Sequence, residues 1–157
     1  MSIEQIEPSK HPGRVVVGVD GSKESMQALR WAARLATSSG VRIDTVAAWE
    51  LPATLGWAAA PQEWDPARDA LTVLANTIDE VFGTQRPKDL QLTVRQGGAA
   101  RVLLEESEGA LMLIVGSRGH GGFMGLLLGS VSANVAEHAT CPVLVIHGET
   151  MLPLTTS

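Results

Sequence analysis

The length, composition and charge of the chain exclude several classes of protein. With 157 residues, 45% of them hydrophobic and 18% charged, the chain suits one folded domain and is not of a disordered class. A net charge of −5 without a cluster of Lys or Arg argues against nucleic acid as the main partner, and no apolar run is long enough to cross a membrane. The single cysteine, Cys141, cannot form an internal disulfide, which indicates a reducing, cytoplasmic location.

We expect one folded domain over residues 14–148, with a flexible leader at residues 1–13 and a flexible tail at residues 149–157. Residues 14–19 form a short apolar run rich in β-branched side chains, which predicts a strand buried on both faces. The tripeptide Asp20-Gly21-Ser22 then supplies turn residues and a helix N-cap. The chain therefore starts as a strand followed by a turn into a helix.

Helix, strand and loop patterns alternate in the next part of the chain. Residues 23–38 carry apolar side chains at helical spacing, and Gly40 stands where such a helix would end. Residues 41–49 alternate as a second strand, and residues 67–81 repeat the helical spacing. Between these two elements, the segment that begins at Leu51 and ends at Pro66 holds three prolines, which predicts an irregular loop.

The second half of the chain repeats the order of strand and helix. We predict a strand at residues 90–94, a helix at 99–108 and a strand at 111–115. A glycine-rich loop at 116–129, a helix at 130–139 and a last strand from Val143 to His147 follow. Because strands that alternate with helices need crossover connections, we expect an α/β fold with an open five-stranded parallel sheet and helices on both faces. Ligands of such sheets bind where the strand order reverses, so the loops after the first and fourth strands are the candidate site.

The glycine-rich loop has the composition of an anion-binding segment. Between Gly116 and Ser132 it holds five glycines besides Gly116, which permit positive φ and close backbone approach to a ligand. Ser130 and Ser132 stand at the start of the following helix, where unpaired amides favour phosphate. In the alternative interpretation the glycines only make turns and the serines only cap the helix. The loop contains neither a Walker motif nor a dinucleotide fingerprint.

The spacing of this loop resembles the ATP-binding signature of the universal stress protein family. The similarity extends over roughly residues 14–148, because other segments match the family in the same order. The matching segments are Gly116-x2-Gly119-x9-Gly129-Ser130, Val15-Val-Val-Gly-Val-Asp20-Gly-Ser22, Ala110-Leu-Met-Leu-Ile-Val-Gly-Ser-Arg-Gly119, Leu127-Leu-Gly-Ser-Val-Ser132 and Cys141-Pro-Val-Leu-Val-Ile146. The combination is more specific than any of its parts.

The resemblance implies a Rossmann-like sheet of order 3-2-1-4-5, as in the adenine nucleotide alpha hydrolases, with a nucleotide between the ends of the first and fourth strands. Gly18, Val19 and Asp20 would lie by the ribose and adenine, with Asp20 also near any Mg²⁺, and Ala48 would offer backbone contacts to the adenine. The ribose would contact Val115 and Gly116, and the phosphates would contact Gly119, Gly129, Ser130, Val131 and Ser132. Arg118 would either pair with a phosphate or remain a solvated surface charge.

The function implied by the resemblance is that of an ATP-binding sensor or regulatory module in a stress response, bound to Mg²⁺-ATP and read by a protein partner. The alternatives are a weak ATP hydrolase or phosphotransferase, and a protein that binds another adenine nucleotide such as cyclic AMP. No acid/base couple adjoins the loop and Asp20 is the only nearby carboxylate, so we expect slow hydrolysis at most. The last strand, from Val143 to His147, would form an exposed sheet edge and the interface of a homodimer.

Overall fold

Five strands and four helices alternate along the chain in the computed structural model, which describes residues 13–53, 63–119 and 128–148. The elements are β1 (Arg14–Gly18), α1 (Lys23–Ser39), β2 (Arg42–Trp49), α2 (Pro66–Phe82), β3 (Leu90–Gln96), α3 (Ala99–Glu106), β4 (Met112–Gly116), α4 (Ser130–His138) and β5 (Val143–Ile146). Four segments lie outside the described residues: residues 1–12 of the predicted leader, the predicted tail, the middle of the loop from Leu51 to Pro66, and the centre of the glycine-rich loop.

The five strands form one parallel sheet of order β3-β2-β1-β4-β5, which confirms the predicted topology. After β1 the chain crosses to β2 on one side, and after β4 it crosses to β5 on the other, so the order reverses between β1 and β4. Strand β2 also extends beyond β1, because its pairing with β1 ends at Val46 while its pairing with β3 continues to Trp49. These two features leave an opening at the carboxyl ends of the central strands.

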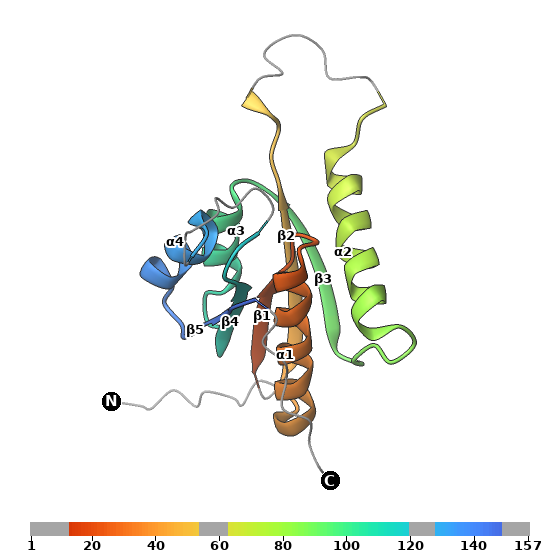
Figure 1. Ribbon diagram of the computed structural model, residues 1–157, viewed down its shortest axis with the longest axis vertical. Helices are drawn as coiled ribbons and strands as arrows, with labels where there is room; N and C mark the ends of the chain where they lie inside the picture. Colours follow the sequence, from red (N-terminus) through yellow and green to blue (C-terminus); the bar gives the residue numbers. More distant parts are fainter. Residues whose placement is uncertain (1–12, 54–62, 120–127, 149–157) are drawn as a thin grey trace, which may run out of the picture.

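Helices cover both faces of the sheet, as Figure 1 shows: α1 and α2 lie on one face, and α3 and α4 lie on the other. Alternate residues of β1 pack against the helices on the two faces: Val15 and Val17 pack toward α1, and Val16 packs toward α3 and α4. All three of these valines are buried. The continuous apolar run in the sequence therefore reflects a central strand that is covered on both faces.

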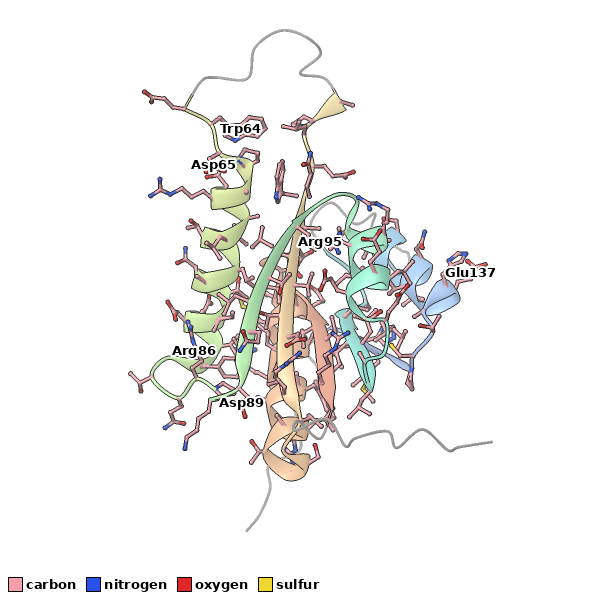
Figure 2. The ribbon with its side chains drawn as sticks, turned by 180° about the vertical axis from the view of Figure 1, so that it is seen from behind. Trp64, Asp65, Arg86, Asp89, Arg95 and Glu137 are labelled. Carbon is pink, nitrogen blue, oxygen red and sulfur yellow. The ribbon has the colours of Figure 1, made fainter. Side chains whose placement is uncertain are left out.

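The helix boundaries follow from local capping. The Ser22 side chain accepts a hydrogen bond from the Ser25 amide at the start of α1, and Gly40 ends that helix with φ of 70°. Asp65 caps α2 in the same way, and Gly83 ends it with φ of 54°. Figure 2 shows Trp64 and Asp65 at this first turn of α2. The predicted stop at Gly40 is confirmed.

One group of charges fastens the amino ends of the strands to α3. Arg14 donates to the backbone oxygens of Glu106 and Glu108, both at 2.7 Å, and lies 3.3 Å from the Asp44 carboxylate. Arg42 contacts the same carboxylate with two nitrogens, at 2.8 and 2.9 Å. This hydrogen bonding to Asp44 raises the pKa of the Arg42 guanidinium. The cluster lies at the end of the sheet opposite the opening and is structural.

A second group of charges joins β3 to α3. Arg95 contacts Glu106 at 2.7 Å and Glu105 at 2.9 Å, while Arg101 contacts Glu105 at 2.8 Å across one helical turn. The hydrogen bond to Glu106 raises the pKa of Arg95, and the hydrogen bond from Arg101 lowers the pKa of Glu105. Arg95 projects from β3 toward α3 in Figure 2. These exposed pairs help to align α3, whose first turn borders the opening.

The predicted elements differ from the structure by one or two residues at their ends, and two of these differences have a local cause. The helix that starts at Ala99 ends at Glu106, before the predicted 108, because Ser107 forms its C-cap and Gly109 follows with φ of 73°. Strand β4 begins at Met112 instead of 111, since Leu111 is 51% exposed and only its N–H bonds to β1. Both differences lie at the edge of the molecule away from the opening.

Candidate functional site

A pocket of about 420 Å³ occupies the opening at the carboxyl ends of the central strands. Its size lies in the range of small-molecule sites. The structure brings every residue that the sequence nominated into its lining: Gly18, Val19, Asp20, Ala48, Val115, Gly116, Arg118, Gly119, Gly129, Ser130, Val131 and Ser132. Segments that are far apart in the sequence therefore meet around a single cavity.

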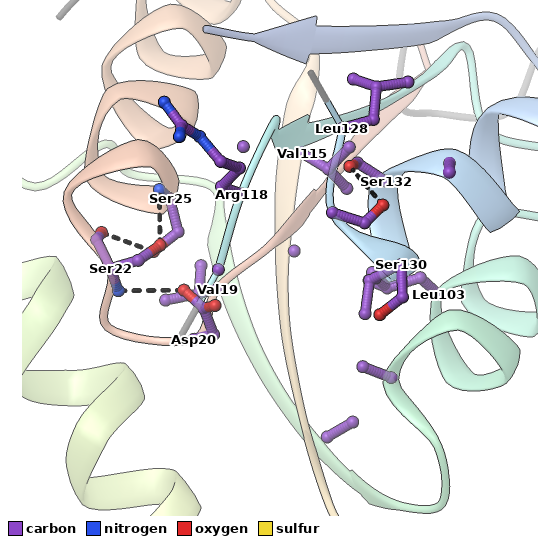
Figure 3. Close-up of a pocket in the computed structure, with 18 of the residues that line it drawn as sticks. Val19, Asp20, Ser22, Ser25, Leu103, Val115, Arg118, Leu128, Ser130 and Ser132 are labelled. Carbon is purple, nitrogen blue, oxygen red and sulfur yellow. Dashed lines mark hydrogen bonds between the residues drawn. The ribbon is translucent and has the colours of Figure 1, made fainter. Parts of the chain in front are cut away.

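The turn after β1 forms one wall of this pocket. Gly21 adopts φ of 83°, and Asp20 Oδ1 accepts the Ser22 amide at 2.9 Å. The Ser22 hydroxyl in turn accepts the Ser25 amide at 3.2 Å, and the Ser25 hydroxyl donates to the Ser22 carbonyl at 2.9 Å. Figure 3 shows these bonds beside the pocket. The first turn of α1 is thus capped by its own side chains.

Two glycines at the end of β4 and just after it pack closely against this wall. A Cβ on Gly116 would lie 2.5 Å from the Cβ of Glu24, and a Cβ on Gly119 would overlap the Asp20 carboxylate. Neither of these glycines, nor Gly129, has a positive φ. The expected use of positive φ is therefore not seen at these three positions, where the absence of a side chain lets the loops after β1 and β4 approach each other.

The opposite wall of the pocket is the first turn of α4. Gly129 is the N-cap residue, with φ of −70° and ψ of 169°, and it has no side chain that could accept a hydrogen bond from the amides of this turn. Ser130, Val131 and Ser132 are the first three residues of the helix, so their N–H groups have no partner within it. In Figure 3, Ser130 and Ser132 lie across the pocket from Asp20. The first turn of α4 therefore offers amide donors and the positive end of a helix dipole.

The two serines of α4 differ in their surroundings. Ser130 is exposed, whereas Ser132 is only 2% exposed. The Ser132 hydroxyl donates to the Ser117 carbonyl at 2.8 Å and lies 3.1 Å from the Gly129 carbonyl. It therefore has an acceptor within the protein, which the sequence alone did not indicate.

Backbone groups of β2 face the pocket at Ala48. The last hydrogen bond between β1 and β2 joins the Val19 N–H to the Val46 carbonyl at 2.9 Å. Backbone polar groups alternate in direction along a strand, so the N–H and C=O of Ala48 point to the same side as those of Val46. Strand β1 ends at Gly18, which pairs with Val46, so no residue of β1 pairs with Ala48. One donor and one acceptor of Ala48 therefore remain beside the cavity.

Arg118 and Asp20 are the charged residues of the lining among the residues that the structure describes. The Arg118 side chain is exposed and lies on the α1 side of the pocket in Figure 3. Within the described ranges, no group of three or more His, Cys, Asp or Glu side chains could hold a metal ion. His120 of the glycine-rich loop lies outside those ranges.

Several lining residues were not nominated from the sequence. Ala99 and Leu103 of α3 form part of the apolar surface of the cavity, with Val46 of β2. Ala99 and Leu103 are four residues apart on one helix, so their common face was detectable from spacing. The remaining additions to the lining are Ser22, Ser25, Leu128 and Ala133.

No helix among the described residues is both long and apolar enough to cross a membrane.

Curated relatives resemble the chain in sequence. A universal stress protein of Mycolicibacterium smegmatis is 34% identical to this chain over 142 residues, which are 86% of this chain and 48% of that protein. The chain spans about half the length of the curated relatives that it matches.

Solved structures share the fold. A universal stress protein in complex with cAMP is 27% identical with a TM-score of 0.62, over 86% of this chain and 96% of that one. A universal stress protein from Archaeoglobus fulgidus in complex with dAMP has a TM-score of 0.57 at 23% identity, over 85% of this chain and 97% of that one, a likeness of fold. The sequence profile of the universal stress protein family matches residues 12–147. The chain therefore belongs to the universal stress protein family.

Proposed function

We propose that the protein binds an adenine nucleotide, ATP with Mg²⁺, in the pocket between the ends of β1 and β4. The observation that carries the proposal is the placement of two unlike binding surfaces on one cavity of about 420 Å³. One surface is the backbone donor and acceptor of Ala48, and the other is the uncapped first turn of α4. A nucleotide has a hydrogen-bonding base at one end and phosphates at the other, which matches this arrangement.

The base belongs at the β2 end of the pocket. Adenine carries an amino donor beside a ring-nitrogen acceptor, so it pairs with one C=O and one N–H of a strand, while guanine presents an oxygen acceptor at the position of the amino group. Ala48 supplies such a pair, and the apolar side chains of Val46 and Leu103 line the same pocket. These groups favour adenine over guanine.

The phosphates belong at α4. Both α1 and α4 point their first turns at the pocket, but Ser22 caps α1 with its side chain whereas Gly129 gives α4 no side-chain cap. The amides at the start of α4 are therefore the stronger anion site of the two. Arg118 adjoins Gly119 and lines the pocket, so its guanidinium would pair with the same phosphates.

The residues present fit Mg²⁺ only in company with a nucleotide. Mg²⁺ is commonly held by one or two carboxylates together with substrate phosphates and waters. Asp20 supplies one carboxylate in the lining, one of whose oxygens accepts the Ser22 amide. Asp20 would hold the ion beside the phosphates, where the ion would neutralise their charge.

The proposed role is that of a nucleotide-dependent sensor or regulatory module in a stress response, whose bound state is read by a partner protein. The related structure with cAMP at 27% identity supports adenine nucleotides as the ligand class and makes cAMP the second candidate ligand. Slow ATP hydrolysis is the alternative activity, because Asp20 lies where a carboxylate could orient water toward a phosphate. The single cysteine of the chain supports a cytoplasmic location.

The proposed assembly is a homodimer through β5. This strand lies at the edge of the sheet, next to β4 on one side only. Its outer backbone groups are therefore available for pairing with a second copy.

The test is to denature the purified protein and identify any released nucleotide by mass spectrometry. Calorimetry on the emptied protein then compares ATP with Mg²⁺, ATP with EDTA, cAMP and GTP. Binding of ATP that weakens in EDTA and exceeds that of GTP supports the proposal. Tighter binding of cAMP moves the assignment to that ligand, and absence of both released nucleotide and measurable binding rejects the proposal.

A further inference from the structure

The two ends of the glycine-rich loop are fastened to each other at Ser117. The Ser117 carbonyl accepts the Gly129 amide at 2.6 Å and the Ser132 hydroxyl at 2.8 Å. Ser117 and Ser132 are 1% and 2% exposed. The chain before residue 118 and the chain after residue 128 are therefore joined at one buried hydrogen-bonded point.

This fastening is itself attached to the sheet. The Ser117 amide donates to the Ile146 carbonyl of β5 at 2.7 Å, so the start of the loop is fixed by a strand. Gly129, at the other end, is the N-cap residue of α4. The bonds at Ser117 thus set the position of the first turn of α4 relative to β4.

The Ser132 hydroxyl is committed to this fastening. A serine hydroxyl has one hydrogen to donate, and its nearest acceptors are the carbonyls of Ser117 and Gly129, at 2.8 and 3.1 Å. Its burial keeps water from replacing either of them. Ser130, two residues earlier, is exposed and lines the same pocket, and no described residue accepts a hydrogen bond from its hydroxyl.

We infer that Ser132 is a positioning residue: its hydroxyl holds the amides at the start of α4 in their binding arrangement and does not contact the ligand, which leaves the hydroxyl contact to Ser130, already expected from the sequence. The part about the ligand depends on the proposed function. The fastening itself does not, because it belongs to the protein without ligand. An anion site made of backbone amides works best when those amides are held in place before the ligand arrives.

Hydrogen exchange of the ligand-free protein separates the two serines. Ser132→Ala should speed the exchange of peptides that cover residues 117–132, because the Ser117 carbonyl loses one of its two donors. Ser130→Ala, the matched control, should exchange like the wild-type protein in the same peptides. Ser132→Thr keeps a hydroxyl and should restore slow exchange, and it also serves if Ser132→Ala does not fold.

Calorimetry with Mg²⁺-ATP on the same variants tests the division of roles. We expect both alanine variants to lose roughly tenfold in affinity, and Ser132→Thr to regain most of the loss. Wild-type exchange in ligand-free Ser132→Ala together with lost affinity would overturn the inference, because the hydroxyl would then act on the ligand directly. If the wild-type protein binds no nucleotide, the proposed function fails, and the exchange data alone still decide whether Ser132 fastens the loop.

Discussion

The Asp20 carboxylate and Gly119 lie in direct contact, so that a Cβ on Gly119 would overlap Asp20 Oδ2. Asp20 follows β1 and Gly119 follows β4, so this contact joins the two loops that border the pocket. Oδ1 of the same carboxylate accepts the Ser22 amide at 2.9 Å. The position of the Asp20 carboxylate therefore depends on the absence of a side chain at residue 119.

The first prediction concerns Gly119→Ala. The new methyl group should displace the Asp20 carboxylate, which is the movable end of a side chain, and leave the fold intact. We expect the affinity for Mg²⁺-ATP to fall about tenfold or more by calorimetry, while the unfolding midpoint changes little. Gly98→Ala is the matched control, because Gly98 lies outside the pocket lining and its Cβ would lie at an ordinary 3.6 Å from Glu50 Oε1.

A double-mutant cycle checks the cause of that loss. If the methyl group acts through Asp20, then Gly119→Ala should cost much less affinity in a chain that already carries Asp20→Ala. Equal losses with and without Asp20 would contradict this explanation. They would place the effect in the backbone of the loop instead.

The second prediction concerns the base. Ala48→Pro removes the N–H that faces the pocket, and that N–H does not belong to the ladder with β3. The affinity for ATP should fall about tenfold while the strand remains paired. Ala48→Ser keeps the N–H and is the control. A loss of the same size for GTP and ATP would show that Ala48 does not select adenine.

The sequence predicted the fold well because the relevant signals are local. Val15, Val16 and Val17 form a continuous apolar run, which is typical of a strand covered on both faces. Helices do cover both faces of this strand in the structure. Ser22 and Gly40 mark the two ends of α1 through bonds within a few residues of themselves. Signals of this kind can be read without knowing which elements pack together.

The site could be predicted only in part, because its geometry depends on contacts between distant residues. The backbone pattern around Gly119 indicated an anion site, but its contact with Asp20 joins two loops that are almost a hundred residues apart in the sequence. In the same way, the bond from Ser132 to the Ser117 carbonyl appears only once β4 and α4 are in place. The sequence therefore nominated most of the lining and missed how its members contact one another.

The third prediction separates stability from binding. Arg14→Ala removes two hydrogen bonds to the carboxyl end of α3 and one of the two partners of Asp44, so it should cost about 1–3 kcal/mol in the free energy of unfolding. Arg86→Ala is the control, because its pair with Asp79 is more exposed and should cost less than about 0.5 kcal/mol. Urea unfolding measures both. ATP affinity should be unchanged in Arg14→Ala, and a large loss would contradict the structural role of this cluster.

The fourth prediction concerns pH. The hydrogen bond from Arg101 lowers the pKa of Glu105 in the folded protein, so its ionised form stabilises the fold above the unfolded pKa, and that contribution is lost as pH falls through the folded pKa. Glu105→Gln should therefore lower the unfolding midpoint at neutral pH and have no effect in acid. The neutral-pH difference should also shrink in 1 M salt, because the pair is exposed. A pH-independent difference in calorimetry would show that Glu105 acts through packing.

The fifth prediction tests the proposed dimer. The carbonyls of Pro142 and Ile146 bond to β4, so the backbone groups of the alternate residue Val145 face the free edge of β5. Val145→Pro should remove an outward N–H without breaking the bonds to β4, and should shift the protein to monomer in sedimentation at micromolar concentrations. Val145→Ala controls for the lost side-chain packing and should remain dimeric. A wild-type protein that is monomeric across this range would reject the dimer, and a dimeric Val145→Pro variant would place its interface elsewhere.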